Sequence, residues 1–129
     1  MSSYSDIVRD HFANPRNVGE IAGVPFGQAG KPGEGPHMRL WLRVVDDVVA
    51  EVRYKTYGCP ASIASGSALT EMVEGQSVEA CGAISAGGLL AALGGLPLGK
   101  RHCAQLAISA LRDALARATA PAASALSAD

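Results

Sequence analysis

Hydrophobic and polar residues alternate through two neighbouring stretches in the middle of the chain. In residues 38–45 every second position is apolar (Met38, Leu40, Leu42, Val44), with Arg39 and Arg43 between them. Residues 48–57 repeat the pattern, with Val48, Ala50, Val52 and Tyr54 opposite Glu51, Arg53 and Lys55. Two such stretches, joined by a turn at Asp46-Asp47, predict an antiparallel hairpin with one buried and one solvated face.

Helical spacing replaces this alternation farther along the chain. Pro60 suits the first position of a helix, because its missing N–H would have no partner there. We expect this helix to run to about Glu74 and to be closed by Gly75. Ser77 and Ser85 are good N-caps for two shorter helices, of which the second ends at a pair of glycines.

Both ends of the periodic region are also predicted to be helical. Residues 4–12 have helical spacing and stop at Asn14-Pro15. From about Arg101 the strongest helical pattern has apolar residues at Cys103, Leu106, Ala107, Ala110, Leu111, Ala114 and Leu115. Residues 17–37 are rich in Gly and Pro and predict a loop with a short strand near residues 24–26. Helices that cluster after a small antiparallel sheet predict the α+β class.

Composition is that of one compact domain. The chain has 129 residues, of which 48% are hydrophobic and 18% charged. We expect residues 1–118 to form the domain and residues 119–129 to form a flexible tail. A net charge of −1 gives no electrostatic reason to bind nucleic acid or an anionic membrane. The apolar runs, the longest around residues 89–93, are too short to span a bilayer, and the start of the chain lacks a secretory signal, so we expect a cytoplasmic protein.

Cysteine is the residue type with the clearest chemical meaning. There are three cysteines, Cys59, Cys81 and Cys103, and in a reducing cytosol thiols serve metals, clusters or sulfur chemistry rather than structural bridges. Cys59 directly precedes Pro60 and would cap the helix, where the free N–H groups of the first turn favour thiolate over thiol. The alternative for Cys59 is a small apolar residue buried at a strand end.

His102 and Cys103 stand together at the start of the last helix. The first helical turn can direct both side chains toward one point, and imidazole with thiolate suits zinc, iron or an iron–sulfur cluster. The alternative makes His102 a surface residue and Cys103 the first member of the apolar stripe.

Three segments resemble the IscU/NifU-type iron–sulfur cluster assembly scaffolds. They are YSDIVRDHFANPRNVG (4–19), YKTYGCPASIASGSALTEMVEG (54–75) and LPLGKRHCAQLAISALRDAL (96–115). They occur in the family's order, and the resemblance spans residues 3 to about 117. The resemblance implies a small antiparallel sheet of about three strands with helices on one face and a long C-terminal helix. It also implies that Cys59, His102 and Cys103, the second cysteine, the histidine and the third cysteine of the scaffolds, gather at one tip.

The first scaffold cysteine has no counterpart here. Where scaffolds read Ala-Cys-Gly-Asp, this chain has Gly33-Glu34-Gly35-Pro36, so that Glu34 replaces the cysteine and Pro36 the aspartate. A carboxylate can complete a zinc or iron site but is an unusual cluster ligand. Glu34 is the preferred fourth ligand because it aligns directly, and His37 is the alternative. For both residues, the alternative to a ligand role is a solvated side chain on the loop.

Other residues are expected to serve packing. His11 lies in the first matching segment but not at a ligand position, and Cys81 matches no family cysteine and would fill a gap under a short helix. The small residues Ser62, Ser65 and Gly66 would permit close packing of their helix rather than bind phosphate.

The resemblance implies a scaffold or carrier that turns over no substrate. It would hold an iron–sulfur cluster, [2Fe–2S] in preference to [4Fe–4S], or a single zinc or iron ion. Its partners would be a cysteine desulfurase and apo-protein acceptors, with an Hsp70-type chaperone recognising Leu96–Lys100, which reads Leu-Pro-Leu-Gly-Lys where the family has Leu-Pro-Pro-Val-Lys. The alternatives are a zinc-dependent sulfur acceptor at Cys59, as in SufU-type proteins, and a degenerate scaffold kept as a metal-binding interaction module. A monomer and a homo-oligomer both remain open.

Overall fold

The computed structural model describes residues 4–119, so that all but the first residue of the predicted tail lies outside the described residues. The elements follow in the order α1 (Asp6–Ala13), β1 (Phe26–Ala29), β2 (His37–Val45), β3 (Val48–Tyr57), α2 (Pro60–Val73), α3 (Val78–Gly82), α4 (Ala86–Ala92), the 3₁₀ turn η1 (Leu98–Lys100) and α5 (His102–Ala118). The predicted α+β class with a long C-terminal helix is confirmed.

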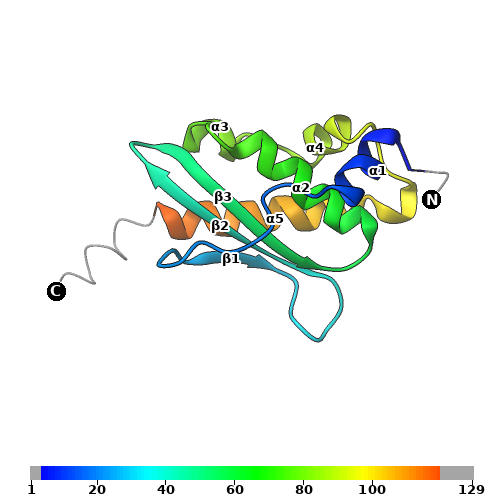
Figure 1. The fold of residues 1–129 in the computed structure, drawn as a ribbon, viewed down its shortest axis with the longest axis horizontal. Helices are drawn as coiled ribbons and strands as arrows, with labels where there is room; N and C mark the ends of the chain where they lie inside the picture. The colour runs from blue at the N-terminus through cyan, green and yellow to red at the C-terminus, as the bar shows by residue number, and fades with distance from the viewer. Residues whose placement is uncertain (1–3, 120–129) are drawn as a thin grey trace.

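Helices cover one face of a three-stranded sheet. The strands are antiparallel in the order β1-β2-β3. Figure 1 shows α5 running along the back of the sheet, with α2 beside it and α1 against the outer side of α2. The buried apolar side chains of β2 and β3 pack against α2 and α5 in one core, to which Met38, Leu40, Tyr54, Leu69 and Leu111 contribute.

The hairpin differs from its predicted alternation at one point. Glu51 pairs with Arg43, but Val49 pairs with Val44, so Ala50 is an extra residue in β3. Because of this bulge, the residues of β3 that come before Glu51 point to the opposite face of the sheet from the one that strict alternation predicts. Val49 is therefore fully buried, whereas Val48 and Ala50, predicted to point inward, are exposed.

The first strand lies slightly later than the predicted position near residues 24–26, and its tight contact with α5 accounts for this. A Cβ on Gly27 would lie 2.1 Å from the backbone nitrogen of Ala114, so only glycine lets β1 approach the helix this closely. The backbone N–H of Gln28 then donates to the Asp113 carboxylate at 2.8 Å. The strand therefore forms at the position where Gly27 allows close approach to α5 and the Asp113 carboxylate can accept from the next backbone N–H.

Helix boundaries follow the predicted caps. Ser77 and Ser85 accept hydrogen bonds from the backbone N–H groups of Ala80 and Gly88. Pro60 occupies the start of α2, and Gly75 follows its end with a φ of +81°. Within residues 4–119, no helix combines the length and the apolar character needed to cross a membrane.

Candidate metal centre

Two thiols from distant parts of the chain meet at one end of the molecule. The sulfur atoms of Cys59 and Cys103 lie 3.7 Å apart although the residues are 44 positions apart in sequence. Cys59 precedes α2 and Cys103 lies in the first turn of α5. In Figure 1 both helices begin at the right-hand end of the molecule, which also carries the loop between β1 and β2. The predicted convergence of these two cysteines is present.

Cys59 has the environment of an activated thiol. It is the N-cap of α2, although its side chain makes no capping hydrogen bond. Partial burial acts to raise the pKa of Cys59, but the nearby backbone N–H groups of Ser62 and Ala61 and the Cys103 thiol outweigh it, so that the pKa lies below its ordinary value. A lowered pKa favours the thiolate, which is the form that binds metals.

Cys103 is more deeply placed, with 1% of its surface exposed. Burial raises the pKa of Cys103, the adjacent Cys59 adds to the increase, and a hydrogen bond from the Ser62 hydroxyl opposes it. The two thiols therefore differ: Cys59 ionises first, and the Cys103 S–H can donate to its sulfur.

His102 reaches the thiol pair through Cys103. Its Nε2 lies 3.7 Å from the Cys103 sulfur, and the residue is exposed. On its other side His102 borders a groove of about 370 Å³ that is also lined by Pro36, Gln105 and Leu106. An exposed imidazole beside a thiol is free to turn toward an incoming ion.

Glu34 lies on the exposed loop between β1 and β2, where its backbone N–H donates to the Lys31 carbonyl. This loop does pass beside the thiol pair, because Pro36 is only 3.7 Å from the position of a Cβ on Gly58. Among the hydrogen bonds of residues 4–119, none joins Glu34 to Cys59, His102 or Cys103.

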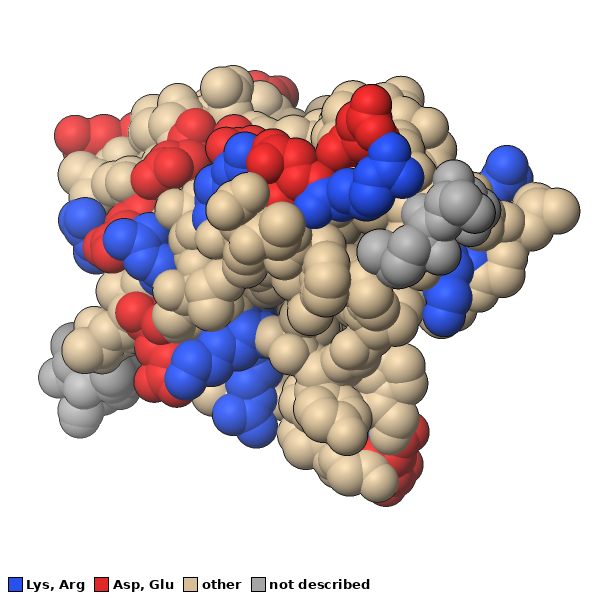
Figure 2. All heavy atoms as spheres, turned by 45° about the vertical axis from the view of Figure 1, so that its right-hand side comes forward, with Lys and Arg blue, Asp and Glu red and all other residues tan. Residues whose placement is uncertain are grey.

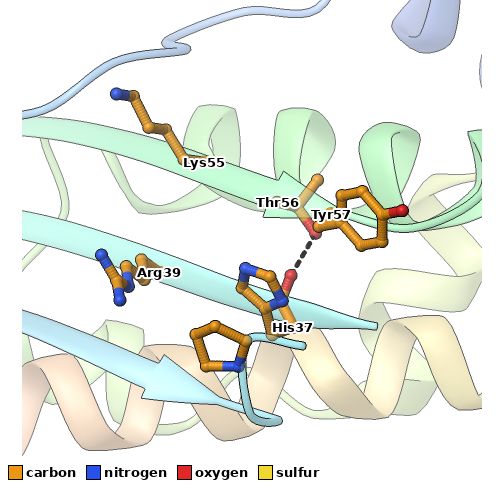
Figure 3. Close-up of a pocket in the computed structure, with 6 residues that line it drawn as sticks. His37, Arg39, Lys55, Thr56 and Tyr57 are labelled. Atoms are coloured by element: carbon orange, nitrogen blue, oxygen red, sulfur yellow. Dashed lines mark hydrogen bonds between the residues drawn. The ribbon is translucent and has the colours of Figure 1, made fainter. Parts of the chain in front are cut away.

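His37 points toward the other side of the sheet. It neighbours the buried Met38 in β2, and its ring stacks on Tyr57 with centroids 5.8 Å apart. Figure 3 shows His37 with Tyr57 and Thr56 in a pocket of about 310 Å³ that is also lined by Arg39 and Lys55. The Nδ1 of His37 is buried without a hydrogen-bond partner. The described contacts of His37 are therefore with the sheet.

The donor chemistry fits a metal, but a complete ligand set is not preformed. Within the part of the chain that the structure describes, no three His, Cys, Asp or Glu side chains are already arranged to hold a metal ion. Two thiols and an adjacent imidazole are nevertheless the donors that zinc, iron and iron–sulfur clusters take. Rotation of His102 and movement of the Glu34 loop are the changes that would complete a four-ligand site.

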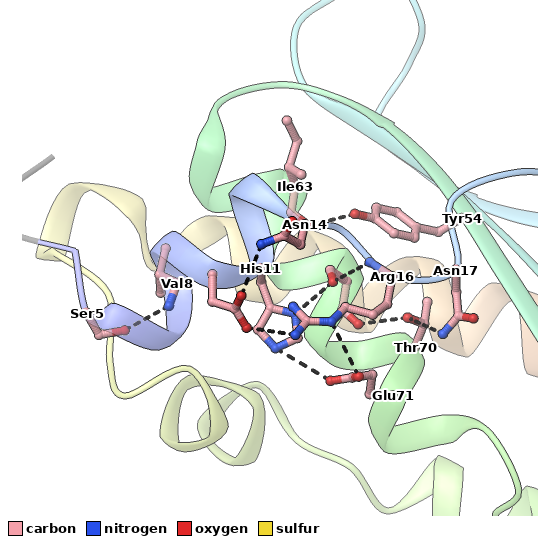
Figure 4. Close-up of polar contacts among 12 residues, drawn as sticks. Ser5, Val8, His11, Asn14, Arg16, Asn17, Tyr54, Ile63, Thr70 and Glu71 are labelled. Atoms are coloured by element: carbon pink, nitrogen blue, oxygen red, sulfur yellow. Dashed lines mark hydrogen bonds and ion pairs between the residues drawn. The ribbon is translucent and has the colours of Figure 1, made fainter.

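His11 and Cys81 have the packing environments expected of them. Cys81 is fully buried. His11 is 7% exposed and joins α1 to α2 through Ser67, with Arg16 and Glu71 around it (Figure 4). Figure 2 shows acidic and basic side chains next to one another on this side of the molecule, as expected from a nearly neutral chain.

The sequence did not indicate a role at the site for Ser62, whose hydroxyl contacts Cys103. Only its place three residues after Cys59 could have indicated this role.

A family model described as the NifU-like N terminal domain matches residues 3–123. The chain belongs to this family. Among its relatives, the iron–sulfur cluster assembly scaffold protein IscU 1 of Archaeoglobus fulgidus is 43% identical over 113 residues, which span 87% of this chain and 74% of that protein. The scaffold protein IscU of Haemophilus influenzae is 41% identical over 119 residues, 88% of this chain and 94% of that protein.

Solved structures agree on the fold. A protein described as hypothetical superposes with a TM-score of 0.69 at 28% identity, covering 86% of this chain and 95% of that one. A putative iron–sulfur cluster assembly scaffold for the SUF system, from Fervidobacterium islandicum, gives a TM-score of 0.69 at 17% identity, covering 88% of this chain and 97% of that one. The second comparison bears on the fold alone.

Proposed function

We propose that this protein is an iron–sulfur cluster assembly scaffold or carrier. It binds iron, zinc or an iron–sulfur cluster through Cys59, Cys103 and His102 and passes this cargo to apo-proteins. The 3.7 Å separation of the two sulfur atoms, in a chain whose relatives are named as IscU scaffolds, is the observation that carries the proposal. Binding and transfer of cargo require no turnover of a substrate.

The three proposed ligands have different roles when the metal binds and when it is released. Cys59, partly exposed and with a lowered pKa, offers the first thiolate to an arriving ion. Cys103 loses its proton when the metal binds, because a coordinated thiol is deprotonated. His102 lies at the solvent side, where it can join or leave the metal without disturbing the core.

Glu34 is the proposed fourth ligand, with His37 as the alternative. The loop that carries Glu34 passes beside the start of α2 at Pro36, so a movement of this loop would bring the Glu34 carboxylate toward the thiol pair. His37 would have to leave its stack with Tyr57. A site with one carboxylate favours a single zinc or iron ion, because a cluster prefers four thiolate or imidazole ligands. Where a cluster is bound, the proposal is [2Fe–2S].

Metal analysis of cysteine variants tests the proposal. The protein is purified anaerobically and offered either zinc or iron with sulfide and thiol. We expect retention of metal or of a coloured cluster by the natural protein and by Cys81→Ser, the matched control for loss of a buried thiol. Cys59→Ser with Cys103→Ser should lose it. Equal metal content in the double variant would refute the assignment.

The proposed partners are a cysteine desulfurase, which supplies sulfur, and apo-protein acceptors, in a cytoplasmic setting. An Hsp70-type chaperone is a further proposed partner. Within the segment Leu96–Lys100 the accessible apolar side chain is Leu98, which is 79% exposed, whereas Leu96 is buried. Loss of binding by a Leu98→Asp variant would support this contact; retention at full affinity would exclude it.

A second candidate function is favoured by the lowered pKa of Cys59. In this function Cys59 is a sulfur acceptor: its thiolate attacks the outer sulfur of a desulfurase persulfide, a Cys59 persulfide forms, and the desulfurase thiolate leaves. Stimulation of a desulfurase that disappears in Cys59→Ala would favour it, and unchanged stimulation would argue against it. A third candidate, a degenerate interaction module, predicts that Glu34→Cys gains cluster binding absent from the natural protein.

A further inference from the structure

A buried hydroxyl lies beside both sulfur atoms of the candidate metal centre. The Oγ of Ser62 is 3.4 Å from the Cys103 sulfur and 3.9 Å from the Cys59 sulfur. Ser62 has no exposed surface. Water therefore does not reach this hydroxyl, and its hydrogen bonds are made to the sulfur atoms around it.

The position of Ser62 in α2 explains why its hydroxyl turns to sulfur. A serine inside a helix commonly donates to the carbonyl four residues earlier. Ser65, also buried, does so and donates to the Ala61 carbonyl at 2.7 Å. For Ser62 the residue four positions earlier is Gly58, which precedes the helix and its N-cap. The hydroxyl donates instead to the Cys103 sulfur.

Gly58 leaves the space that this arrangement requires. A Cβ on Gly58 would lie 2.8 Å from the Ser62 Oγ and 3.0 Å from the Ser62 Cβ. Any side chain there would push the hydroxyl away from its place. Gly58 thus leaves space on one side of the Ser62 hydroxyl, and the Cys103 sulfur accepts its hydrogen bond on the other side.

We propose that Ser62 is a positioning residue of the metal site, whose hydroxyl donates to the Cys103 sulfur and holds it beside the Cys59 sulfur when metal is bound. The proposal rests on the function proposed above. A thiolate bound to a metal keeps lone pairs that accept hydrogen bonds, and groups that hold a ligand in this way commonly change metal affinity by about 10- to 100-fold. The single hydroxyl proton serves one sulfur, and the shorter distance assigns it to Cys103.

Cobalt(II) binding separates this role from simple packing. Cobalt bound by thiolates has sulfur-to-metal charge-transfer bands, and a hydrogen bond to sulfur lowers the energy of the donor electrons. We expect Ser62→Ala to shift these bands to lower energy and to weaken cobalt binding about 10-fold. Ser65→Ala is the matched control, since it removes a buried hydroxyl from the same helix, and it should keep the natural bands and affinity.

The outcomes are distinguishable. Bands and affinity of Ser62→Ala that match the natural protein would overturn the role of Ser62, with the metal site intact. A shift of equal size in Ser65→Ala would also overturn it, because the effect would then come from the helix as a whole. If the natural protein shows no charge-transfer bands, the metal site itself fails. Gly58→Ala, which displaces the hydroxyl without removing it, should shift the bands in the same direction as Ser62→Ala.

Discussion

The ring of Tyr54 occupies the space into which a side chain of Gly66 would extend. A Cβ on Gly66 would come within 2.4 Å of the ring carbon Cε2. The Tyr54 hydroxyl passes beyond the glycine and donates to the Ile63 carbonyl at 2.8 Å, and burial raises the pKa of Tyr54, which keeps that proton in place. This contact sets α2 close to β3. It thereby fixes the point at which Cys59 leaves the strand and begins the helix.

Substitution of Gly66 by alanine is expected to destabilise the protein. Alanine gains about 1 kcal/mol over glycine in a helix, but a methyl group forced against a buried ring typically costs about 1–3 kcal/mol. Since the ring is hydrogen-bonded and cannot simply turn away, we expect a net loss of up to about 2 kcal/mol in the free energy of unfolding. Urea denaturation measures it.

Gly82 provides the matched control for this substitution. It also lies in a helix, and a Cβ there would meet nothing within 4 Å. Gly82→Ala should leave stability unchanged or raise it by about 0.4–1 kcal/mol. If Gly66→Ala were as stable as Gly82→Ala, the ring of Tyr54 would not be the constraint described here.

Much of this arrangement could be predicted from residue patterns. The inward position of Tyr54 follows from the alternation of β3, and the small residues of α2 indicated a closely packed helix. The serine caps and the apolar stripe of α5 also have direct sequence signals. Each of these features depends on residues within a few positions of one another, which is why the sequence alone is sufficient.

Features that depend on contacts between distant segments were not predictable in the same way. The bulge at Ala50 reverses which valines are buried, and it has no marker such as glycine in the sequence. Ser62 resembles Ser65 in residue type and burial. Only the proximity of Cys103, 41 positions away, gives the two serines different partners.

Gly27→Ala tests the contact between β1 and α5. The added methyl group would meet the backbone nitrogen of Ala114, which cannot move without displacing the helix. We expect a loss of about 2–3 kcal/mol in the free energy of unfolding. Asp113→Ala removes the carboxylate that accepts from the Gln28 N–H and, at the surface, from Arg117, and should cost about 1 kcal/mol. Urea denaturation of both variants checks that Gly27→Ala loses more stability than Asp113→Ala. A Gly27→Ala variant more stable than Asp113→Ala would contradict the close contact between β1 and α5.

The three cysteines are expected to react at different rates with iodoacetamide. Cys59 is partly exposed and has a lowered pKa, so it carries the most thiolate near neutral pH and reacts first. Burial raises the pKa of Cys81 and of Cys103, and Cys81 should react only after unfolding. Peptide mass spectrometry after timed labelling gives the order. Zinc should protect Cys59 and Cys103, and faster labelling of Cys81 than of Cys59 would show that the described environments are wrong.

His11 is expected to make stability depend on pH. Burial lowers the pKa of His11 from its ordinary value of 6.5, and the adjacent Arg16 lowers it further, whereas Glu71 and Asp10 act in the opposite direction. The Arg16 guanidinium can only donate, and it lies 3.2 Å from Nδ1, so Nδ1 accepts and the ring proton is on Nε2, 3.6 Å from Glu71 (Figure 4). The folded protein therefore holds His11 neutral.

The sign of the pH effect follows from this neutral state. A pKa that is lower in the folded than in the unfolded chain contributes stability above pH 6.5, and that contribution is lost as the pH falls below 6.5 toward the folded pKa. Urea denaturation at several pH values between 7 and 5 should show a decrease of at most about 1.4 kcal/mol per pH unit from this one proton. His11→Gln should be less stable at pH 7, because the contact with Ser67 changes, but its stability should fall less steeply with acidification. An unchanged slope in His11→Gln would mean that another group senses the pH, because loss of this buried histidine would then have left the uptake of protons on unfolding unchanged.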